Sequence, residues 1–365
     1  ALLYYKRFVQ DLLSINFIIN PYDPCVANKF VKHKQLTVVW HVDDLKVSHR
    51  NPHIVTKMAD WLKATYERLF DDGSGEMQIS RGKIHEYLGM TLDYSTPGQV
   101  SITMVKYIKE ILQLYSKNDN NDKTAKTPAA EHLFKVNEEA SSLTQDQATI
   151  FHNFVAKCLF LTKRARPDIA TAVAFLTTRV KGPDQDDWKK LTRLIRYLRG
   201  SVNLSLVLSA DSVPVPKWWV DGSHATHPGD MRGQTGGCMS LGKGTLSNTS
   251  TKQKLNTRSS TETELVAADD FMPVILWTNY FLEAQGYGHQ DTILYQDNQS
   301  AILLEKNGRK SRSKRTKHLN CRFYFITDRI NKKELSVEYC PTEDMVGYFF
   351  TKPLQGSSAT SENLS

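Results

Sequence analysis

The sequence predicts a multidomain protein in which an α+β part precedes an α/β part. Its 365 residues suffice for two or three domains, each with its own core. The first half combines a hairpin pattern with helical patterns, whereas from Pro216 onward strand patterns alternate with helical ones. A hydrophobic content of 40% and a charged content of 24% are typical of globular proteins, so composition favours neither disorder nor membrane residence.

The first half begins with a helical pattern and continues with strand patterns. Apolar residues recur at helical spacing near the start of the chain, and runs rich in β-branched and aromatic residues indicate strands. In order, the expected elements are an amphipathic helix over residues 1–20, a hairpin over residues 35–49, a helix from His53 and a strand pair from His85. The turn of the hairpin carries two adjacent acids, Asp43 and Asp44. These elements form an α+β unit.

A polar stretch over residues 116–136 contains few β-branched residues, which indicates a linker or an exposed connection. The segments that follow it, residues 151–180 and 187–201, have helical apolar periodicity with basic outer faces. We therefore predict that the chain divides into residues 1–128, a helical connector over 129–215, an α/β domain over 216–355 and a flexible tail over 356–365.

The α/β domain is predicted from regular alternation. Its expected strands are residues 217–223, 236–241, 244–255, 292–297 and 335–340, and its expected helices are residues 261–285, 298–306 and 342–352. Asp221 and Asp297 fall at predicted strand ends, and Glu264 falls in a predicted helix. This order can gather three carboxylates around divalent metal ions, as metal-dependent cleavage of a phosphodiester requires.

Each acid also has a purely structural explanation. Asp221 precedes Gly222, a pair typical of hairpin turns. Glu264 stands three residues after Thr261, as in a capping box. Asp297 ends a strand just before a helix and could cap that helix, although ligands of open α/β sheets bind at the carboxyl ends of strands. These explanations do not account for the order in which the three acids occur.

The charge balance favours a polyanionic partner, because the formal net charge is +8 and the pI is near 9.0. Two basic segments are candidates for contact with nucleic-acid phosphates, which would make binding salt-dependent. Their residues are Lys252 and Lys254 on one face of a predicted strand, and Arg312, Lys314, Arg315, Lys317 and His318 in a run without apolar periodicity. The alternatives are an edge strand guarded by lysine and a solvated charged surface.

The start of the chain and its cysteines indicate an intracellular protein without a membrane partner. Five scattered cysteines without metal-type spacing are typical of reduced thiols. Charged residues interrupt the N-terminal apolar residues too early for a signal peptide, and no segment reaches the roughly 18 uninterrupted apolar residues of a membrane span. The lack of Met at position 1 suggests a piece of a longer polypeptide.

Several short segments occur in the order that one family shows. They are STKQK at 250–254, RSSTETEL at 258–265, YQDNQSAI at 295–302, KRTKH at 314–318, PTED at 341–344 and TKPL at 351–354. Through them, residues 217–354 resemble the ribonuclease H domain of copia-type LTR retrotransposon Pol polyproteins. The resemblance implies a mixed sheet flanked by helices, with two Mg²⁺ ions, or Mn²⁺ as a substitute, held by Asp221, Glu264 and Asp297. It also implies hydrolysis of the RNA strand of RNA·DNA hybrids by water activated between the metals.

The first half resembles the reverse transcriptase of the same polyproteins. The segments that carry this resemblance are HVDDLKVS around Asp43 and Asp44, YLGM at 87–90, RPDIATAVAFL from Arg166 and RLIRYLRGS from Arg193. It implies a partial palm and thumb in which Asp43 and Asp44 act as catalytic acids on template RNA and primer. The family's further catalytic Asp is expected in an upstream polyprotein segment, so we expect polymerisation from the intact parent protein. Cytoplasmic virus-like particles or the nucleus are the expected location.

The chain departs from the family pattern at two positions. His41 stands where a Tyr usually precedes the acid pair, and Tyr348 stands where the family has a fourth acid in the helix before TKPL. Asp344 would lie on the same helical face, about 5.4 Å along the helix, and is a candidate substitute ligand. Because a phenol binds Mg²⁺ poorly compared with a carboxylate, we expect weakened binding of the second metal.

Three hypotheses on function follow. The first is a metal-dependent ribonuclease H with part of a reverse transcriptase. The second, favoured by Tyr348 and by the missing palm, is a catalytically inactive nucleic-acid-binding remnant of a decayed element. The third is a structural subunit that needs a partner chain to supply the missing palm.

Overall fold

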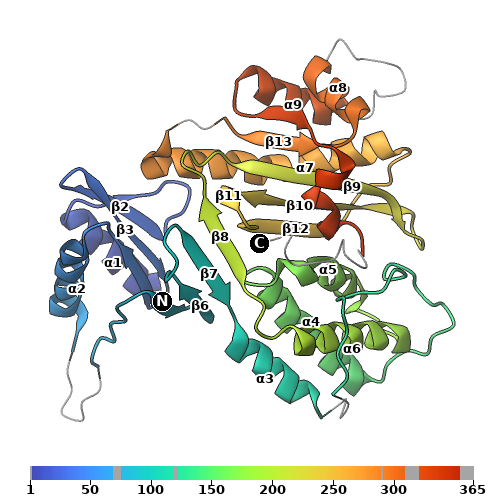
Figure 1. Ribbon diagram of the computed structural model, residues 1–365, viewed down its shortest axis with the longest axis horizontal. Coiled ribbons are helices and arrows are strands. Elements are labelled where there is room, and N and C mark those ends of the chain that lie inside the picture. The colour runs from blue at the N-terminus through green and yellow to red at the C-terminus, as the bar shows by residue number, and fades with distance from the viewer. Residues whose placement is uncertain (1, 69–74, 118–121, 289–290, 309–319, 354–365) are drawn as a thin grey trace. The chain divides into compact units, whose positions relative to one another are not determined.

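The computed structural model describes residues 2–68, 75–117, 122–288, 291–308 and 320–353, which form a mixed α/β protein with several sheets (Figure 1). The chain comprises two compact units, Ala1–Leu88 with Trp277–His289 and Gly89–Leu276 with Gln290–Ser365. The predicted division at residues 128, 215 and 355 stays a prediction, and the predicted tail lies outside the described residues. No helix in the described part is both long and apolar enough to cross a membrane.

The first unit is built on an antiparallel sheet with the strand order β1-β2-β3-β4. Its elements are α1 (Leu2–Ser14), β1 (Ile18–Ile19), β2 (Val26–Val31), β3 (Lys34–His41), β4 (Asp44–Ser48), α2 (Pro52–Tyr66) and β5 (Ile84–Tyr87). Alternate residues of β3, among them Val38 and Trp40, are buried and form one core with apolar residues of both helices. The predicted hairpin is confirmed. The helix predicted over residues 1–20 is wrong beyond Ser14, because Asn16 has a φ of 64° and Ile18–Ile19 pairs with β2.

Part of the second unit consists of helices and a small sheet. The helices are α3 (Val105–Tyr115), α4 (Gln145–Thr162), α5 (Ala170–Arg179) and α6 (Gln185–Gly200), and the sheet strands are β6 (Met90–Asp93), β7 (Gln99–Thr103), β8 (Leu206–Ala210) and β11 (Gly242–Lys243). Helices α4, α5 and α6 fall in the segments predicted to be helical after the polar stretch, whereas α3 precedes that stretch and was not predicted. Capping boxes begin α4, at Thr144, and α6, at Asp184. The apolar face of α6 is buried, so its basic face is the one left outward.

A mixed five-stranded sheet forms the rest of the second unit. Its order is β12-β10-β9-β13-β14, and β13 runs parallel to both neighbours while the other pairs are antiparallel. The bounds are β9 (Lys217–His227), β10 (Arg232–Ser240), β12 (Ser247–Lys252), β13 (Ile293–Gln296), β14 (Ser336–Tyr339), α7 (Ser260–Leu282), α8 (Gln299–Asn307) and α9 (Asn320–Asn331). Helix α7 belongs to this unit as far as Leu276. Trp218 and Val220 of β9 are buried in one core with Phe271 of α7, Ile302 of α8 and Ile326 of α9. This core holds the central strand β9 rigidly beside α7.

The helix predicted over residues 342–352 is wrong. Two 3-10 helices, Thr342–Asp344 and Val346–Phe350, occur instead and are separated at Met345, whose ψ is 87°. Both Met345 and Phe350 are buried, at 3% and 0% exposed. Packing of these two side chains therefore overrides the helical spacing of the sequence.

Candidate metal centre

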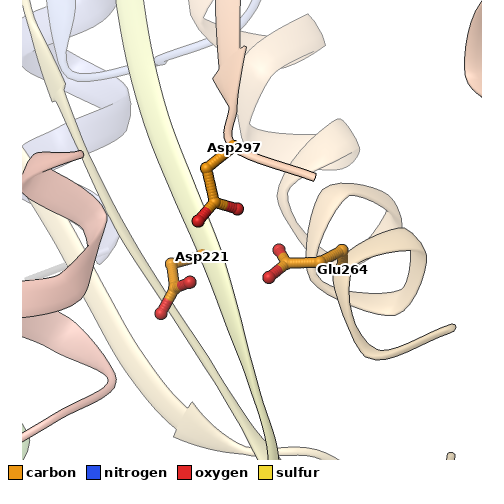
Figure 2. A group of neighbouring side chains, drawn as sticks. All are labelled: Asp221, Glu264 and Asp297. Atoms are coloured by element: carbon orange, nitrogen blue, oxygen red, sulfur yellow. The ribbon is translucent and has the colours of Figure 1, made fainter. Parts of the chain in front are cut away.

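The three acids predicted from the sequence lie together in the second unit. Asp221 is in β9, Glu264 is near the start of α7, and Asp297 directly follows β13. One oxygen of each carboxylate lies within 4.8 Å of those of the other two. Figure 2 shows the three side chains directed into one space. Asp221 and Glu264 are only 2% and 5% exposed, so two of the three charges are held in the interior.

Strand pairing places Asp221 beside Asp297. Tyr295 of β13 is opposite Trp219 of β9, and the same register two residues further along brings Asp297 level with Asp221. On its other side Asp221 is paired with Gly236 of β10, in the middle of a strand that continues to His227. The predicted strand end at Asp221 is therefore wrong, and so is the alternative of an Asp-Gly turn.

The capping alternatives for the other two acids are wrong as well. The first turn of α7 is capped by Ser259 and Glu262, whereas Glu264 takes no part in the cap. Helix α8 is capped by Asn298, whose side chain accepts a backbone N–H of the first turn. Glu264 and Asp297 are therefore not placed for capping, and both carboxylates belong to the acid cluster.

The acid cluster concentrates negative charge in a site of low polarity. Burial, followed by the charges of Asp221 and Asp297, raises the pKa of Glu264 well above its usual range, although the Gly222 N–H donates to its Oε2 at 2.9 Å. Burial also raises the pKa of Asp221 to about 6, against the attraction of the Lys352 ammonium. A divalent cation would favour the charged form of all three carboxylates.

The segment that follows Met345 closes one side of the cluster. The Tyr348 hydroxyl donates to Oδ2 of Asp297, and the Thr351 hydroxyl donates to Oδ2 of Asp221. The Lys352 ammonium lies 3.4 Å from the centroid of the Tyr348 ring, within range of a cation–π contact. Sequence reasoning missed Thr351 and Lys352 as site residues. The TKPL segment that contains both was the signal that could have found them.

Two glycines allow this segment to approach Asp221 closely. A Cβ atom at Gly236 would lie 2.5 Å from the backbone C and O atoms of Phe350. A Cβ atom at Gly347 would lie 3.1 Å from the backbone N and the Cβ of Asp221. The backbone that carries Tyr348 is thus held against the sheet by contacts that a larger residue at either glycine would push apart.

Asp344 was predicted to share a helical face with Tyr348. This prediction is wrong, because the two residues are in separate 3-10 helices. Among the described residues, the acids whose oxygens come within 4.8 Å of one another are Asp221, Glu264 and Asp297, without Asp344. A role for Asp344 as a substitute ligand stays a prediction.

The acid pair of the predicted polymerase lies in the first unit. Asp43 follows Val42, whose φ is 56°, and Asp44 begins β4 opposite His41. Both acids are exposed at the hairpin turn, and in the part of the chain that the structure describes they belong to no group of three acids. Their catalytic role stays a prediction.

The predicted basic segments are only partly described. Strand β12 is an edge strand, as the alternative supposed, and it ends at Lys252. The predicted strand face shared by Lys252 and Lys254 is therefore wrong. The Lys252 ammonium lies 2.8 Å from a carboxylate oxygen of Asp230. The run that contains Arg312, Lys314, Arg315, Lys317 and His318 lies outside the described residues.

Comparison with known proteins gives retrotransposon Pol polyproteins as homologues. The chain is 26% identical over 355 residues to the retrovirus-related Pol polyprotein from transposon TNT 1-94 of Nicotiana tabacum, and 24% identical over 355 residues to that from transposon RE1 of Arabidopsis thaliana. It is 22% identical over 335 residues to the transposon Ty1-GR1 Gag-Pol polyprotein of Saccharomyces cerevisiae. These matches cover 96%, 96% and 88% of the chain.

The chain corresponds to a limited part of these relatives. It spans 26%, 23% and 19% of their respective lengths. No family model matches the chain. The homologues therefore support a fragment of a retroelement Pol polyprotein as the class of protein.

Glu305, a buried acid near Glu264 of the acid cluster, predicts that the stability of the protein depends on pH. Glu305 of α8 is 0% exposed, and neither carboxylate oxygen has a hydrogen-bond partner among the described residues. Burial raises the pKa of Glu305 from 4.5 to about 8. Because the folded chain keeps a proton that the unfolded chain has released, stability falls as pH rises between these two values.

Glu305→Gln is therefore expected to raise the free energy of unfolding at pH 7 by about 3 kcal/mol, and by little near pH 4. Urea denaturation at the two pH values measures this difference. Glu138→Gln, at an exposed position, is the matched control and should change neither value. A Glu305→Gln protein no more stable than the parent at pH 7 would contradict a raised pKa at this position.

Proposed function

We propose that this chain is the reverse transcriptase and ribonuclease H part of a copia-type Pol polyprotein, and that it hydrolyses the RNA strand of RNA·DNA hybrids. The observation that carries the proposal is the convergence of three acids around one mixed sheet: Asp221 in β9, Asp297 directly after β13 and Glu264 in the adjacent helix α7. Homology to retrotransposon Pol polyproteins supports a nucleic-acid substrate.

The three carboxylates fit Mg²⁺, because hard oxygen ligands within 4.8 Å of one another match its preference and the buried charges need a counter-ion. Asp221 and Asp297 would hold two ions between them, with Glu264 on the first. When bound, Mg²⁺ would stabilise negative charge on the phosphate and lower the pKa of a water molecule, and Mn²⁺ would substitute for it.

The residues around the acids orient the carboxylates for this role. The Gly222 N–H, the Thr351 hydroxyl and the Tyr348 hydroxyl donate one hydrogen bond each, to Glu264, Asp221 and Asp297 respectively. Such hydrogen bonds fix the direction in which a ligand presents its free oxygen. The phenol also occupies one oxygen of Asp297, which weakens the site for a second ion.

A labelled RNA·DNA hybrid tests the proposal directly. We expect the purified chain to cleave the RNA strand when Mg²⁺ is added and to leave the hybrid intact in EDTA. A DNA duplex of the same sequence should not be cut, because recognition of the cut strand requires 2′-hydroxyls. Binding of the hybrid without cleavage at any Mg²⁺ or Mn²⁺ concentration would contradict the proposed hydrolysis.

The second candidate function is a nucleic-acid-binding remnant without catalysis. Tyr348 favours it, because a neutral phenol donates to Asp297 from the position where the family has an acid. Polymerisation on template RNA and primer is proposed only for a longer protein that adds a carboxylate to Asp43 and Asp44. In both cases residues 1–128 would be the palm and thumb part, and virus-like particles or the nucleus the location.

A further inference from the structure

A basic pocket in the second unit is not used by the proposed hydrolysis. The pocket has a volume of about 700 Å³, and five of its eight lining residues are basic while none is acidic. The basic residues are Lys123, Lys126, Lys189, Arg193 and Arg196, and we call this site the Lys-Arg pocket. An anionic ligand of considerable size is the chemistry that such a lining would take.

One wall of the Lys-Arg pocket is a single face of α6. Lys189, Arg193 and Arg196 follow one another at spacings of four and three residues, so they project from the same side of the helix. The other side of α6 is anchored in the interior, where Leu191 and Leu194 are 0% exposed. The three cations are therefore mounted on a rigid element.

The second wall, residues 123–127, is tied to α6 by hydrogen bonds. The Ala125 N–H donates to the carbonyl oxygen of Arg196 at 3.3 Å. The Arg193 guanidinium donates through Nη2 to the hydroxyl of Thr127 at 2.8 Å. Thr127 is itself buried and lines the pocket. The two walls are consequently held at a fixed separation.

The lining of the pocket contains no acidic side chain. Nε of Arg193 is buried and has no hydrogen-bond partner among the described residues. Lys126 and Lys189 are exposed and take part in no ion pair that the described residues make. Like charges that share one pocket repel each other, so an anion that binds there gains from Lys126, Lys189 and Arg193 together.

We propose that the Lys-Arg pocket binds consecutive phosphates of a nucleic-acid strand. Guanidinium and ammonium groups together with threonine hydroxyls are the side chains that contact phosphates in protein–nucleic acid complexes. The pocket is too large for one phosphate and suits a run of them. The phosphate chemistry stands on the pocket alone, whereas a nucleic acid as its source rests on the proposed function.

The test compares two double variants that each remove two exposed positive charges from the second unit. Lys126→Ala with Lys189→Ala alters the pocket, and Lys109→Ala with Lys181→Ala is the matched control outside it. Fluorescence anisotropy measures binding of a labelled RNA·DNA hybrid in EDTA, at salt concentrations from about 50 to 200 mM. EDTA prevents cleavage, so the measurement does not depend on whether the chain is a ribonuclease.

The pocket variant is expected to reduce the slope of log affinity against log salt by about 2, because each lost phosphate contact is worth about 0.9. The control should keep the slope of the parent. Equal slopes in all three proteins, or equal losses in both variants, would overturn the pocket as a nucleic-acid site.

Sodium tripolyphosphate separates the two sources of phosphate. It should compete with the hybrid for the parent and not for the pocket variant. If the pocket variant loses tripolyphosphate binding but keeps the salt slope of the parent for the hybrid, a nucleic acid is overturned as the ligand. A chain that never cleaves hybrid but shows the pocket-dependent slope would support this inference while contradicting the proposed hydrolysis.

Discussion

Asp221→Asn is expected to abolish Mg²⁺-dependent cleavage of an RNA·DNA hybrid and to remove most metal binding. Asp221 is the member of the acid cluster that lies in the central strand β9, level with Asp297 and near Glu264. The amide keeps the shape of the side chain but carries no charge for a hard cation. The cleavage rate should fall by more than about 100-fold, since even the loss of an outer hydrogen-bond partner of a metal ligand costs about 10- to 100-fold.

The stability of the Asp221→Asn protein separates a site residue from a structural one. The substitution relieves repulsion among buried carboxylates, so the unfolding temperature should not fall. Isothermal titration with Mg²⁺, hybrid cleavage and thermal unfolding are measured together. Asp146→Asn, at an exposed position, serves as the control and should leave Mg²⁺ binding and hybrid cleavage unchanged. Full cleavage by the Asp221→Asn protein would rule out the acid cluster as the catalytic centre.

Tyr348→Asp is expected to raise hybrid cleavage by about tenfold or more, which corresponds to about 1.4 kcal/mol of transition-state stabilisation. It removes the phenol that donates to Asp297 and supplies a carboxylate at the position where the resemblance to ribonuclease H domains implies a fourth acid. Titration with Mg²⁺ should show a second binding event that the parent lacks or shows only weakly. Both readouts are needed, because metal binding can improve without a gain in cleavage.

Tyr348→Phe is the control that removes the hydroxyl without adding an acid. An equal gain from both variants would show that the hydroxyl on Asp297 limits the reaction, and that the missing acid does not. Lys352 lies close enough to pair with a carboxylate introduced at position 348, so adding Lys352→Met should enlarge the gain. No change in cleavage by any of these folded variants would contradict a limiting second metal.

Much of the α/β part of the fold is predictable because its strands and helices alternate in clear patterns. The order of Asp221, Glu264 and Asp297 predicted their convergence for the same reason, since two of the acids were expected at strand ends and the third in a helix of the same α/β domain. The Asp221-Gly222 pair suggested a turn, because Asp-Gly pairs are usual in turns, and this interpretation was wrong. Pairing of β9 with β10 on one side and β13 on the other keeps that dipeptide extended, and no local pattern contains this information.

The segment before TKPL shows the limit of periodicity. Met345 and Phe350 are five positions apart, so in one α-helix they would point about 140° away from each other. Both are buried here, and the chain bends at Met345 between the two 3-10 helices. The contacts of Tyr348 and Thr351 with the acid cluster depend on this bend. They join residues 51 and 130 positions apart, which no sequence spacing could have indicated.

The two glycines beside Asp221 bear on the mutational history of the site. Gly236 and Gly347 permit the close approach of the backbone around Tyr348 to the sheet, and this approach involves Phe350 and Asp221 and not the side chain at position 348. The codons for tyrosine and aspartate differ by a single base. A chain with Tyr348 and one with an aspartate at this position are therefore one point mutation apart, and the two glycine contacts that bring the segment to the sheet are the same in both.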